Sequence, residues 1–314
     1  MIGRVPAVTA GVACTLCAVA ASLLPPFARF VAGELGVLIV VAVGVNLVMG
    51  VAGLFSVASP AFLGLGATSV AILLIHSVPL LPSVLAAVLL GCAIGWLVGL
   101  VALRLSGIYF AIITLAFLNV FLAVINWAGP LTGGGYGLVV PIQFLPLVGP
   151  LTADEVAVTA VMCAAIVAVL THFAIHSRVG RAWVAIKNNR AAAELQGINV
   201  ARTQTQAFAL GNTLVTFAGV LQALLWGLTN PNSYSIDVAV AHLSYVVVGG
   251  VTPSIIGPIV GPILLFALPQ FVHQLGSWLD VFYAGFMLMI LLLAPRGIVG
   301  AIEQTRARLT QGRH

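Results

Sequence analysis

The chain has 314 residues, of which 61% are hydrophobic and only 6% are charged. A soluble domain typically has roughly 45–50% apolar and about 25% charged residues. This chain therefore has too little polar surface to face water and must be embedded in lipid. Its net charge of +5 comes from few groups that cluster between apolar runs. Such clustering is typical of membrane topology and speaks against nucleic-acid binding.

Long apolar runs follow one another along the chain, and each is taken as a helix where about 20 residues could cross the hydrocarbon. We expect a retained first helix at residues 7–24 and a second at 35–49, and a third that ends near residue 75. Others follow at 83–103, 108–126, 156–175 and 205–228, then short runs at 238–248 and up to 272, and a last helix at 279–294. The sequence thus predicts an all-α, polytopic integral membrane protein with about 8–10 transmembrane helices. We expect residues 1–314 to form one domain.

Basic residues indicate the orientation of these helices, because cytoplasmic loops carry an excess of Lys and Arg. Arg4 precedes the first helix, Arg104 follows the fourth, and a basic loop at 178–202 follows the sixth. All of these fall on one side when the helices alternate in direction. We expect that side to be the cytoplasm, with both termini there and residues 127–155 outside.

Two glycine-rich interruptions, at residues 50–66 and 249–258, break the apolar pattern. Irregular backbone at membrane depth is tolerated only where protein or a water-filled cavity covers it, and in transporters such breaks often mark the pathway. The helix at 83–103 carries Ala87, Gly91, Gly95 and Gly99, a small residue at every fourth position. Such a stripe lets another helix approach closely, so we expect it to serve packing.

Motifs for catalysis are missing from the sequence. There is no His-Glu-x-x-His and no Gly-x-Ser-x-Gly, and the only lysine, Lys187, follows Ile186 and cannot belong to a phosphate loop. We expect no catalytic residue, no metal site and no cofactor in this chain. The acidic residues fall at or beyond the ends of the predicted helices: Glu34, Asp154, Glu155, Glu194, Asp237, Asp280 and Glu303. Because ion-driven carriers bind the driving ion within the bilayer, this placement predicts that the energy source lies in another protein.

One internal loop, at about residues 177–204, holds five of the chain's 12 basic residues: Arg178, Arg181, Lys187, Arg190 and Arg202. Asn188 and Asn189 are suitable N-caps, residues 190–196 favour a helix, and Gly197 suits the position after its end. We expect a cytoplasmic helix of about two turns. Its apolar side chains, Ala191, Ala192 and Leu195, have no evident partner in the chain, which favours docking by another protein. An ordinary positive-inside loop is the alternative.

Several sequence blocks resemble the permease subunits of branched-chain (hydrophobic) amino acid ABC transporters, in the expected order and over most of the chain. The blocks are residues 46–56 (NLVMGVAGLFS), 107–117 (GIYFAIITLAF), 132–138 (TGGGYGL), 180–186 (GRAWVAI), 192–199 (AAELQGIN), 249–261 with its glycine pair and Gly-Pro step, and 295–297 (PRG). Each block alone is weak, whereas together they are fairly specific.

The resemblance implies an all-helical permease in the bacterial plasma (inner) membrane. Its partners would be a second homologous permease subunit, two cytosolic ATPase subunits that bind ATP and Mg²⁺, and an extracytoplasmic substrate-binding protein. The resemblance also implies a coupling helix that sits in a groove of the ATPase subunit. The residues assigned to this coupling are Lys187, Asn188, Asn189, Arg190, Ala191, Ala192, Glu194, Leu195 and Gly197.

Polar residues within apolar runs are candidates for the transport pathway, because polar atoms facing lipid are costly: Asn46, Ser56, Ser59, Thr114, Asn119, Asn212 and Gln222. Bridging of neighbouring helices is the alternative role. A glycine-rich outer turn is a candidate dock for the binding protein, and plain turn chemistry fits it equally well: Thr132, Gly133, Gly134 and Gly137.

The cargo stays open at this stage among branched-chain and other neutral amino acids, urea or short amides, and small carboxylates. Two other classes of function are alternatives to an ABC permease. One is a stand-alone carrier or channel, and the other is a membrane enzyme, for which no candidate residue stands out.

Overall fold

The computed structural model of the chain describes residues 22, 24–102, 107–141, 144–145, 149–150, 152–267, 285 and 297–298. Its α-helices are α2 (Pro26–Asn46), α3 (Ser59–Ile75), α4 (Leu80–Ala102), α5 (Ile108–Trp127), α6 (Gly129–Thr132), α7 (Ala153–His176), α8 (Arg178–Asn188), α9 (Arg190–Leu195), α10 (Val200–Trp226), α11 (Ile236–Gly249) and α12 (Ile256–Pro262). Two π-helical turns, η1 (Leu47–Val51) and η4 (Ile263–Ala267), extend α2 and α12, and two 3-10 turns are η2 (Gly134–Tyr136) and η3 (Pro231–Ser233). The helices predicted at 7–24 and 279–294, and Arg104, lie almost wholly outside the described residues.

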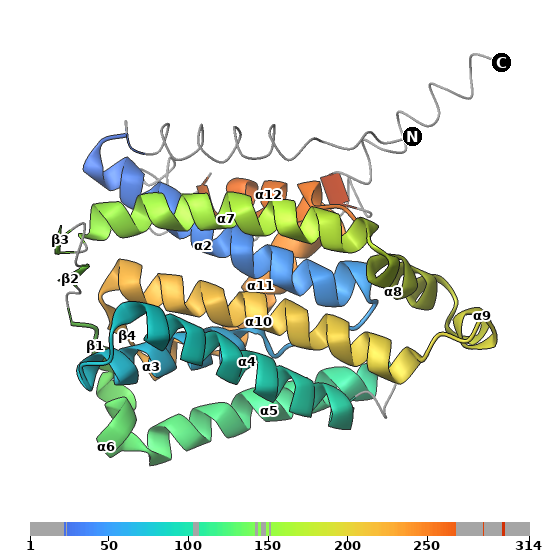
Figure 1. Cartoon of the computed structure of the whole chain (residues 1–314), viewed down its shortest axis with the longest axis horizontal. Coiled ribbons are helices and arrows are strands. Elements are labelled where there is room, and N and C mark those ends of the chain that lie inside the picture. Colours follow the sequence, from blue (N-terminus) through green and yellow to red (C-terminus); the bar gives the residue numbers. More distant parts are fainter. Residues whose placement is uncertain are drawn as a thin grey trace.

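The long helices lie side by side along one axis, with α8 and α9 at one end of the bundle and the short strands at the other (Figure 1). The strands are β1 (Leu138–Val139) with β4 (Leu228–Thr229), and β2 (Phe144–Leu145) with β3 (Gly149–Pro150), each pair antiparallel. Five described helical spans are long and apolar enough to cross a bilayer: Pro26–Val51, Leu80–Leu100, Ile108–Trp127, Ala153–His176 and Val200–Trp226. The prediction of an all-α, polytopic membrane protein is confirmed.

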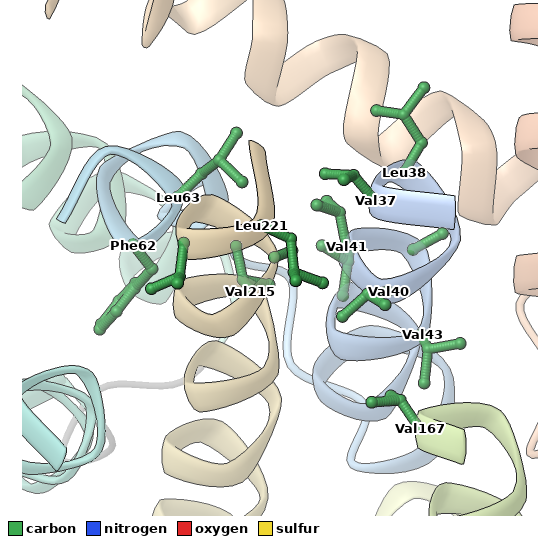
Figure 2. Close-up of a cluster of buried hydrophobic side chains, with 14 of the residues drawn as sticks. Val37, Leu38, Val40, Val41, Val43, Phe62, Leu63, Val167, Val215 and Leu221 are labelled. Carbon is green, nitrogen blue, oxygen red and sulfur yellow. The ribbon is translucent and has the colours of Figure 1, made fainter. Parts of the chain in front are cut away.

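The central helix is α2, which is buried over most of its length. It packs against α7 and α10, and Figure 2 shows Val41 of α2 facing Leu221 of α10. It begins at Pro26, nine residues before the expected start at residue 35. Proline is well suited to the first helical turn, where its missing N–H has no partner to lose. Pro26 therefore starts the helix in the segment between the predicted helices at 7–24 and 35–49.

Small residues bring α4 close to α10, as predicted. A Cβ atom on Gly91 would lie 2.7 Å from the Cβ of Thr216, and one on Gly95 would lie 3.2 Å from the Cα of Ala209. In lipid, helices associate through such close packing because the hydrophobic effect does not drive them together. The packing role of the stripe on α4 is confirmed.

The first break in the apolar pattern is shorter than predicted. It covers residues 52–58, between η1 and α3, and α3 already begins at Ser59. Gly64 and Gly66, which the sequence assigned to the break, lie inside α3. A Cβ on Gly64 would lie 2.7 Å from ring atoms of both Phe121 and Tyr234, so this glycine serves helix packing rather than chain irregularity.

We expect Gly219→Ala to lower the thermal unfolding midpoint, whereas Gly135→Ala leaves it unchanged. A Cβ on Gly219 would overlap the carbonyl oxygen of Leu63 in α3, but one on Gly135 meets nothing within 4 Å. Alanine otherwise stabilises a helix interior by roughly 0.5–1 kcal/mol over glycine, so a loss at Gly219 reports overpacking, which typically costs about 1–3 kcal/mol. Tryptophan fluorescence on heating the two variants in detergent measures the difference. Equal midpoints would contradict the close contact of α3 and α10.

The second break is confirmed, since residues 250–255 separate α11 from α12. The basic loop differs from its prediction, because it holds two helices, α8 and α9, instead of one. Helix α7 agrees with the prediction at 156–175 to within three residues at its start. Its N-terminus is fixed by a capping box, in which Thr152 and Glu155 bond each other's backbone N–H groups.

Candidate functional site

Helix α8 is fastened to the end of the bundle by its own side chains. The hydroxyl of Ser177 accepts a hydrogen bond from the Gly180 N–H (3.2 Å) and so starts the helix. The buried Trp183 donates from Nε1 to the Thr203 carbonyl in α10 (2.9 Å). The sequence prediction missed this helix. Its signals were Ser177 and the apolar pair Trp183 and Ile186, three residues apart.

Helix α9 begins and ends as the sequence predicted. Of the two asparagines proposed as N-caps, Asn189 takes the role: its side-chain oxygen accepts from the Ala192 N–H (3.0 Å). Gly197 has a φ of +78°, the left-handed conformation that glycine adopts readily after a helix end. The short helix α9 therefore has two fixed ends. Figure 1 shows it beyond α8, at the extreme end of the bundle.

The apolar face of α9 differs in part from the predicted one. Ala193 packs against Ile186 and Val200, whereas Ala191 is exposed. Leu195 is 90% exposed, so a large apolar side chain points away from the protein at the tip of the loop. The other coupling candidates with exposed side chains are Asn188, Asn189, Arg190 and Glu194. Arg190 Nε and Glu194 Oε1 lie 3.4 Å apart, a surface pair of little energetic weight.

Lys187 joins helix α8 to η1, which directly precedes the first break, and to the second break. Its Nζ donates to the carbonyl of Gly50 in η1 and to the carbonyl of Val251 after α11 (3.3 Å). Burial lowers the pKa of this ammonium group, and the carbonyl oxygens replace part of the water that it has lost. The only lysine of the chain therefore ties α8 to two segments that are distant in sequence.

The end of α2 contacts the second break directly. Asn46, at the end of α2, donates from Nδ2 to the carbonyls of Thr252 (3.2 Å) and Ser254 (3.1 Å). Irregular backbone within a membrane protein needs such partners. Asn46 therefore provides hydrogen-bond donors for backbone carbonyls of the second break. This contact fits the bridging role, one of the two roles considered for Asn46.

Three of the predicted pathway residues come together in one place. Ser56, Ser59 and Asn212 line a cavity of about 10 Å³, which is about the space of a single water molecule. Ser59 also contacts the buried His242, with Oγ and Nδ1 3.2 Å apart. Beside this cavity, the hydroxyl of Thr114 accepts from the Val57 N–H (3.1 Å) and so packs against the first break.

The other two pathway candidates lie elsewhere. Gln222 lines a larger cavity of about 490 Å³ near the strand end of the bundle. Asn119 is exposed on α5 and donates to the Leu115 carbonyl of its own helix (2.9 Å). The seven polar residues therefore do not form one continuous path through this chain.

The prediction that every acidic residue falls at or beyond a helix end is wrong for Glu34. It is the ninth residue of α2 and is only 6% exposed. Trp226 donates from Nε1 to its Oε2 (2.6 Å). The error follows from the helix start, because α2 begins at Pro26 rather than near residue 35.

Asp154 does lie at a helix end, where it pairs with Arg29 (2.9 Å). Glu155 and Asp237 lie in the first turns of α7 and α11, and Glu194 lies next to the last residue of α9. Asp280 and Glu303 lie outside the described residues.

The conformation of the glycine-rich turn at residues 132–137 is set by its backbone dihedral angles and by one buried side chain. Thr132 is buried and donates to the carbonyls of Ile125 (2.6 Å) and Ala128 (3.0 Å), which closes the end of α5. Gly133 and Gly137 have φ values of +71° and +78°, and Gly134 has +52°, which favour glycine. These features fit the turn-chemistry alternative.

Exposed aromatic side chains lie in this turn and close to it in the chain, and the sequence prediction did not single them out. Tyr136 is 98% exposed and Trp127 is 87% exposed, with Leu131 and Val139 exposed beside them in the chain. Large apolar side chains of this kind are enriched at protein interfaces. They offer a contact surface at the end of the bundle opposite α9.

Known proteins resemble this chain over most of its length. Residues 28–294 match the family described as "Branched-chain amino acid transport system / permease component". The chain is 26% identical to the high-affinity branched-chain amino acid transport system permease protein LivM of Escherichia coli (strain K12), over 86% of this chain and 69% of that protein. It is 30% identical to the corresponding permease protein LivH of Salmonella typhimurium, over 43% of this chain and 44% of the relative.

A similar match, 31% identical over the same shares of each chain, is the permease protein BraD of Pseudomonas aeruginosa. No solved structure matches the chain. The family match covers far more than half of the chain and agrees with the apolar helical bundle. The chain therefore belongs to the branched-chain amino acid transport permease family, as a multi-pass membrane transport subunit and not an enzyme.

Proposed function

We propose that this chain is one permease subunit of an ATP-driven importer for branched-chain or related neutral amino acids. The relatives LivM, LivH and BraD are permease proteins of branched-chain amino acid transport systems, which supports this class of cargo. In this proposal two cytosolic ATPase subunits bind ATP and Mg²⁺, a second homologous permease completes the membrane part, and an extracytoplasmic binding protein delivers the amino acid. Both termini lie in the cytoplasm.

The observation that carries the proposal is the contact set of the α8–α9 loop. One side of the loop exposes Leu195 to solvent, while on the other side Lys187 bonds the backbone at Gly50 and Val251. A partner that moves α9 would thus move a rigid unit, because Trp183 and Ala193 pack α8 and α9 against the base of α10. The displacement then reaches the segments around Gly50 and Val251, whose two arrangements would open and close the path.

The exposed face of α5 supports the presence of a second permease subunit in the assembly. Asn119 and Asn126 are both exposed on this spanning helix, two turns apart. Amide side chains that face lipid are costly, so they are expected against protein or a water-filled path. We propose that this face of α5 lies at the pathway between the two permease subunits, which assigns Asn119 a place outside the single chain.

Co-purification tests the assembly. The chain, a homologous permease and two ATPase subunits from the same source would be co-expressed, with the affinity tag on this chain alone. We expect an intact complex whose ATP turnover rises when amino-acid-loaded binding protein is added. Recovery of this chain without any ATPase subunit, under conditions that keep it monodisperse, would contradict the proposal.

Binding-protein docking gives a second expected result. Tyr136→Asp should weaken the binding protein's affinity by about 30-fold, since hot-spot aromatic residues contribute at least about 2 kcal/mol. Tyr136 has almost no contact within the chain, so the fold should be unaffected. Titration of labelled binding protein onto the complex in nanodiscs measures the affinity. Tyr136→Phe keeps the ring and should bind normally. Equal affinities for Asp and Phe would exclude this turn as the dock.

A stand-alone secondary carrier is the second candidate, and Glu34 is the observation that favours it. A buried carboxylate within a spanning helix is a typical site for a driving proton or sodium ion. This candidate predicts that the chain alone accumulates amino acid in vesicles when an ion gradient is imposed, and that Glu34→Gln abolishes the accumulation. The importer predicts no accumulation by the chain alone under any gradient.

A further inference from the structure

The largest polar-lined space among the described cavities lies between α2, α10 and α11, near the strand end of the bundle. It has a volume of about 490 Å³. Cavities of this size suit small organic ligands. Its wall includes Glu34 from α2, Gln222 and Trp226 from α10, and the loop residues Asn230 and Ser233. The space lies on the side that the proposed topology assigns to the exterior.

Glu34 is the only Asp, Glu, Lys or Arg among the described residues that line this cavity. Its carboxylate receives the indole N–H of Trp226 (2.6 Å) and a side-chain hydrogen bond from Gln222. Both donors are neutral, so they orient the carboxylate without balancing its charge. The described ion pairs of the chain involve other residues. A buried charge without a counter-ion is costly, and a cationic ligand group would remove that cost.

We propose that this cavity is a binding site for a zwitterionic neutral amino acid, with the carboxylate of Glu34 holding the ammonium group. The proposal deepens the importer function and rests on it for the identity of the cargo. It adds a site within the single permease that the cargo occupies on its way inward.

Neutral donors at the rim suit the other end of such a ligand. The side-chain oxygen of Asn230 already accepts from the Asn232 N–H (2.9 Å), which leaves its amide N–H groups to donate. Together with the hydroxyl of Ser233, they can bind the ligand's carboxylate. Leu38, Leu63 and Phe266 line the same cavity and can surround an aliphatic side chain. The site therefore matches a leucine-like molecule in charge, hydrogen bonding and polarity.

The charge of the site discriminates among the cargo classes left open by the sequence. A small carboxylate that lacks an ammonium group would place its negative charge near Glu34 with no compensating cation, and like charges repel. Urea and short amides are neutral and would leave the charge of Glu34 unbalanced. The geometry thus favours amino acids over the other two classes.

Thiol-modification rates test the charge of the site directly. Val238 lines the cavity, and Val238→Cys would be introduced into a background with the four native cysteines replaced. The full-length chain in nanodiscs would be treated with cationic and anionic methanethiosulfonate reagents. Relative to their rates with a free thiol, we expect the cationic reagent to react at least about tenfold faster. Glu34→Gln should remove this preference.

Three probes then define the ligand. L-Leucine and 3-methylbutylamine, which both carry the ammonium group, should slow the modification of Val238→Cys, whereas 4-methylpentanoate, which lacks it, should not. Glu34→Gln should abolish the protection. Val240→Cys is the matched control, because Val240 is exposed on another face of α11 and does not line the cavity. Its rates should be independent of Glu34. Ala241→Cys provides a second reporter inside the cavity if Val238→Cys fails to fold.

Equal rates for both reagents at the two cavity positions, or protection by 4-methylpentanoate as strong as by L-leucine, would overturn the proposal. These measurements need no ATPase subunit, so their failure leaves the importer function untouched. The reverse case is separate as well: a chain that never binds an ATPase subunit but shows ammonium-dependent protection would refute the importer and retain the site.

Discussion

Leu195→Asp is expected to reduce ATP-driven amino acid uptake by at least about tenfold while leaving the permease folded. Leu195 is 90% exposed at the tip of α9, so it contributes little to the stability of the isolated chain. In the proposed assembly it fills a groove of the ATPase subunit. Loss of such an anchor costs at least about 2 kcal/mol, which corresponds to roughly 30-fold in affinity, and an uncompensated carboxylate there adds a desolvation cost.

Uptake of labelled leucine into vesicles that contain all subunits measures this effect, and co-purification shows whether the ATPase subunit has been lost. Leu195→Met is the matched control, since it keeps an apolar side chain of similar volume and should retain most of the uptake. Gel filtration should show the same monodisperse permease for both variants. Full uptake by Leu195→Asp would remove α9 from the coupling interface.

Lys187→Met is expected to separate ATP hydrolysis from transport. The ATPase subunit should still bind, because Leu195 and the exposed face of α9 are unchanged. The carbonyls of Gly50 and Val251 lose their common donor, and a buried polar group without a partner costs about 1–3 kcal/mol. A displacement of α9 would then no longer move the segments around Gly50 and Val251 together. We expect the amount of leucine moved per ATP to fall roughly 5- to 150-fold, as that range of free energy implies.

The ratio of uptake to phosphate release in the same vesicles measures this coupling. Arg178→Met is the matched control, because it removes one positive charge from an exposed position of the same helix. Its ratio should stay near that of the unaltered protein. An unchanged ratio for Lys187→Met would show that the contacts of Lys187 do not carry the coupling. An equal fall for Arg178→Met would show that charge in the loop matters rather than those contacts.

Local sequence patterns were sufficient to predict the lipid-spanning helices, because a helix in lipid must satisfy its own backbone over a fixed length. The predicted helix at 156–175 therefore agrees closely with α7, Ala153–His176. The helix α9 was also predicted, since Asn189 and Gly197 mark its two ends by local chemistry. The helix α8 was missed because the charges of Arg178, Arg181 and Lys187 favour a loop, and only Trp183 and Ile186 are large buried side chains on it.

Local sequence patterns could not predict the contacts that depend on the whole fold. Lys187 meets Gly50 and Val251 across 137 and 64 residues of sequence, and neither partner carries a side-chain signal, because both use backbone carbonyls. The position of Glu34 was misjudged because it depends on where α2 starts, and a proline pair can end one segment or begin the next. The grouping of Ser56, Ser59 and Asn212 likewise follows from the packing of α10 beside the first break.

The proposal that this chain takes its energy from partner ATPases through α9 is tested most directly by leucine uptake into vesicles. One set would contain this chain alone, with proton and sodium gradients imposed in turn. The other would contain the full assembly with binding protein outside and ATP inside. We predict accumulation only in the second set and only with ATP. Gradient-driven accumulation by the chain alone would contradict the account and favour an ion-driven carrier.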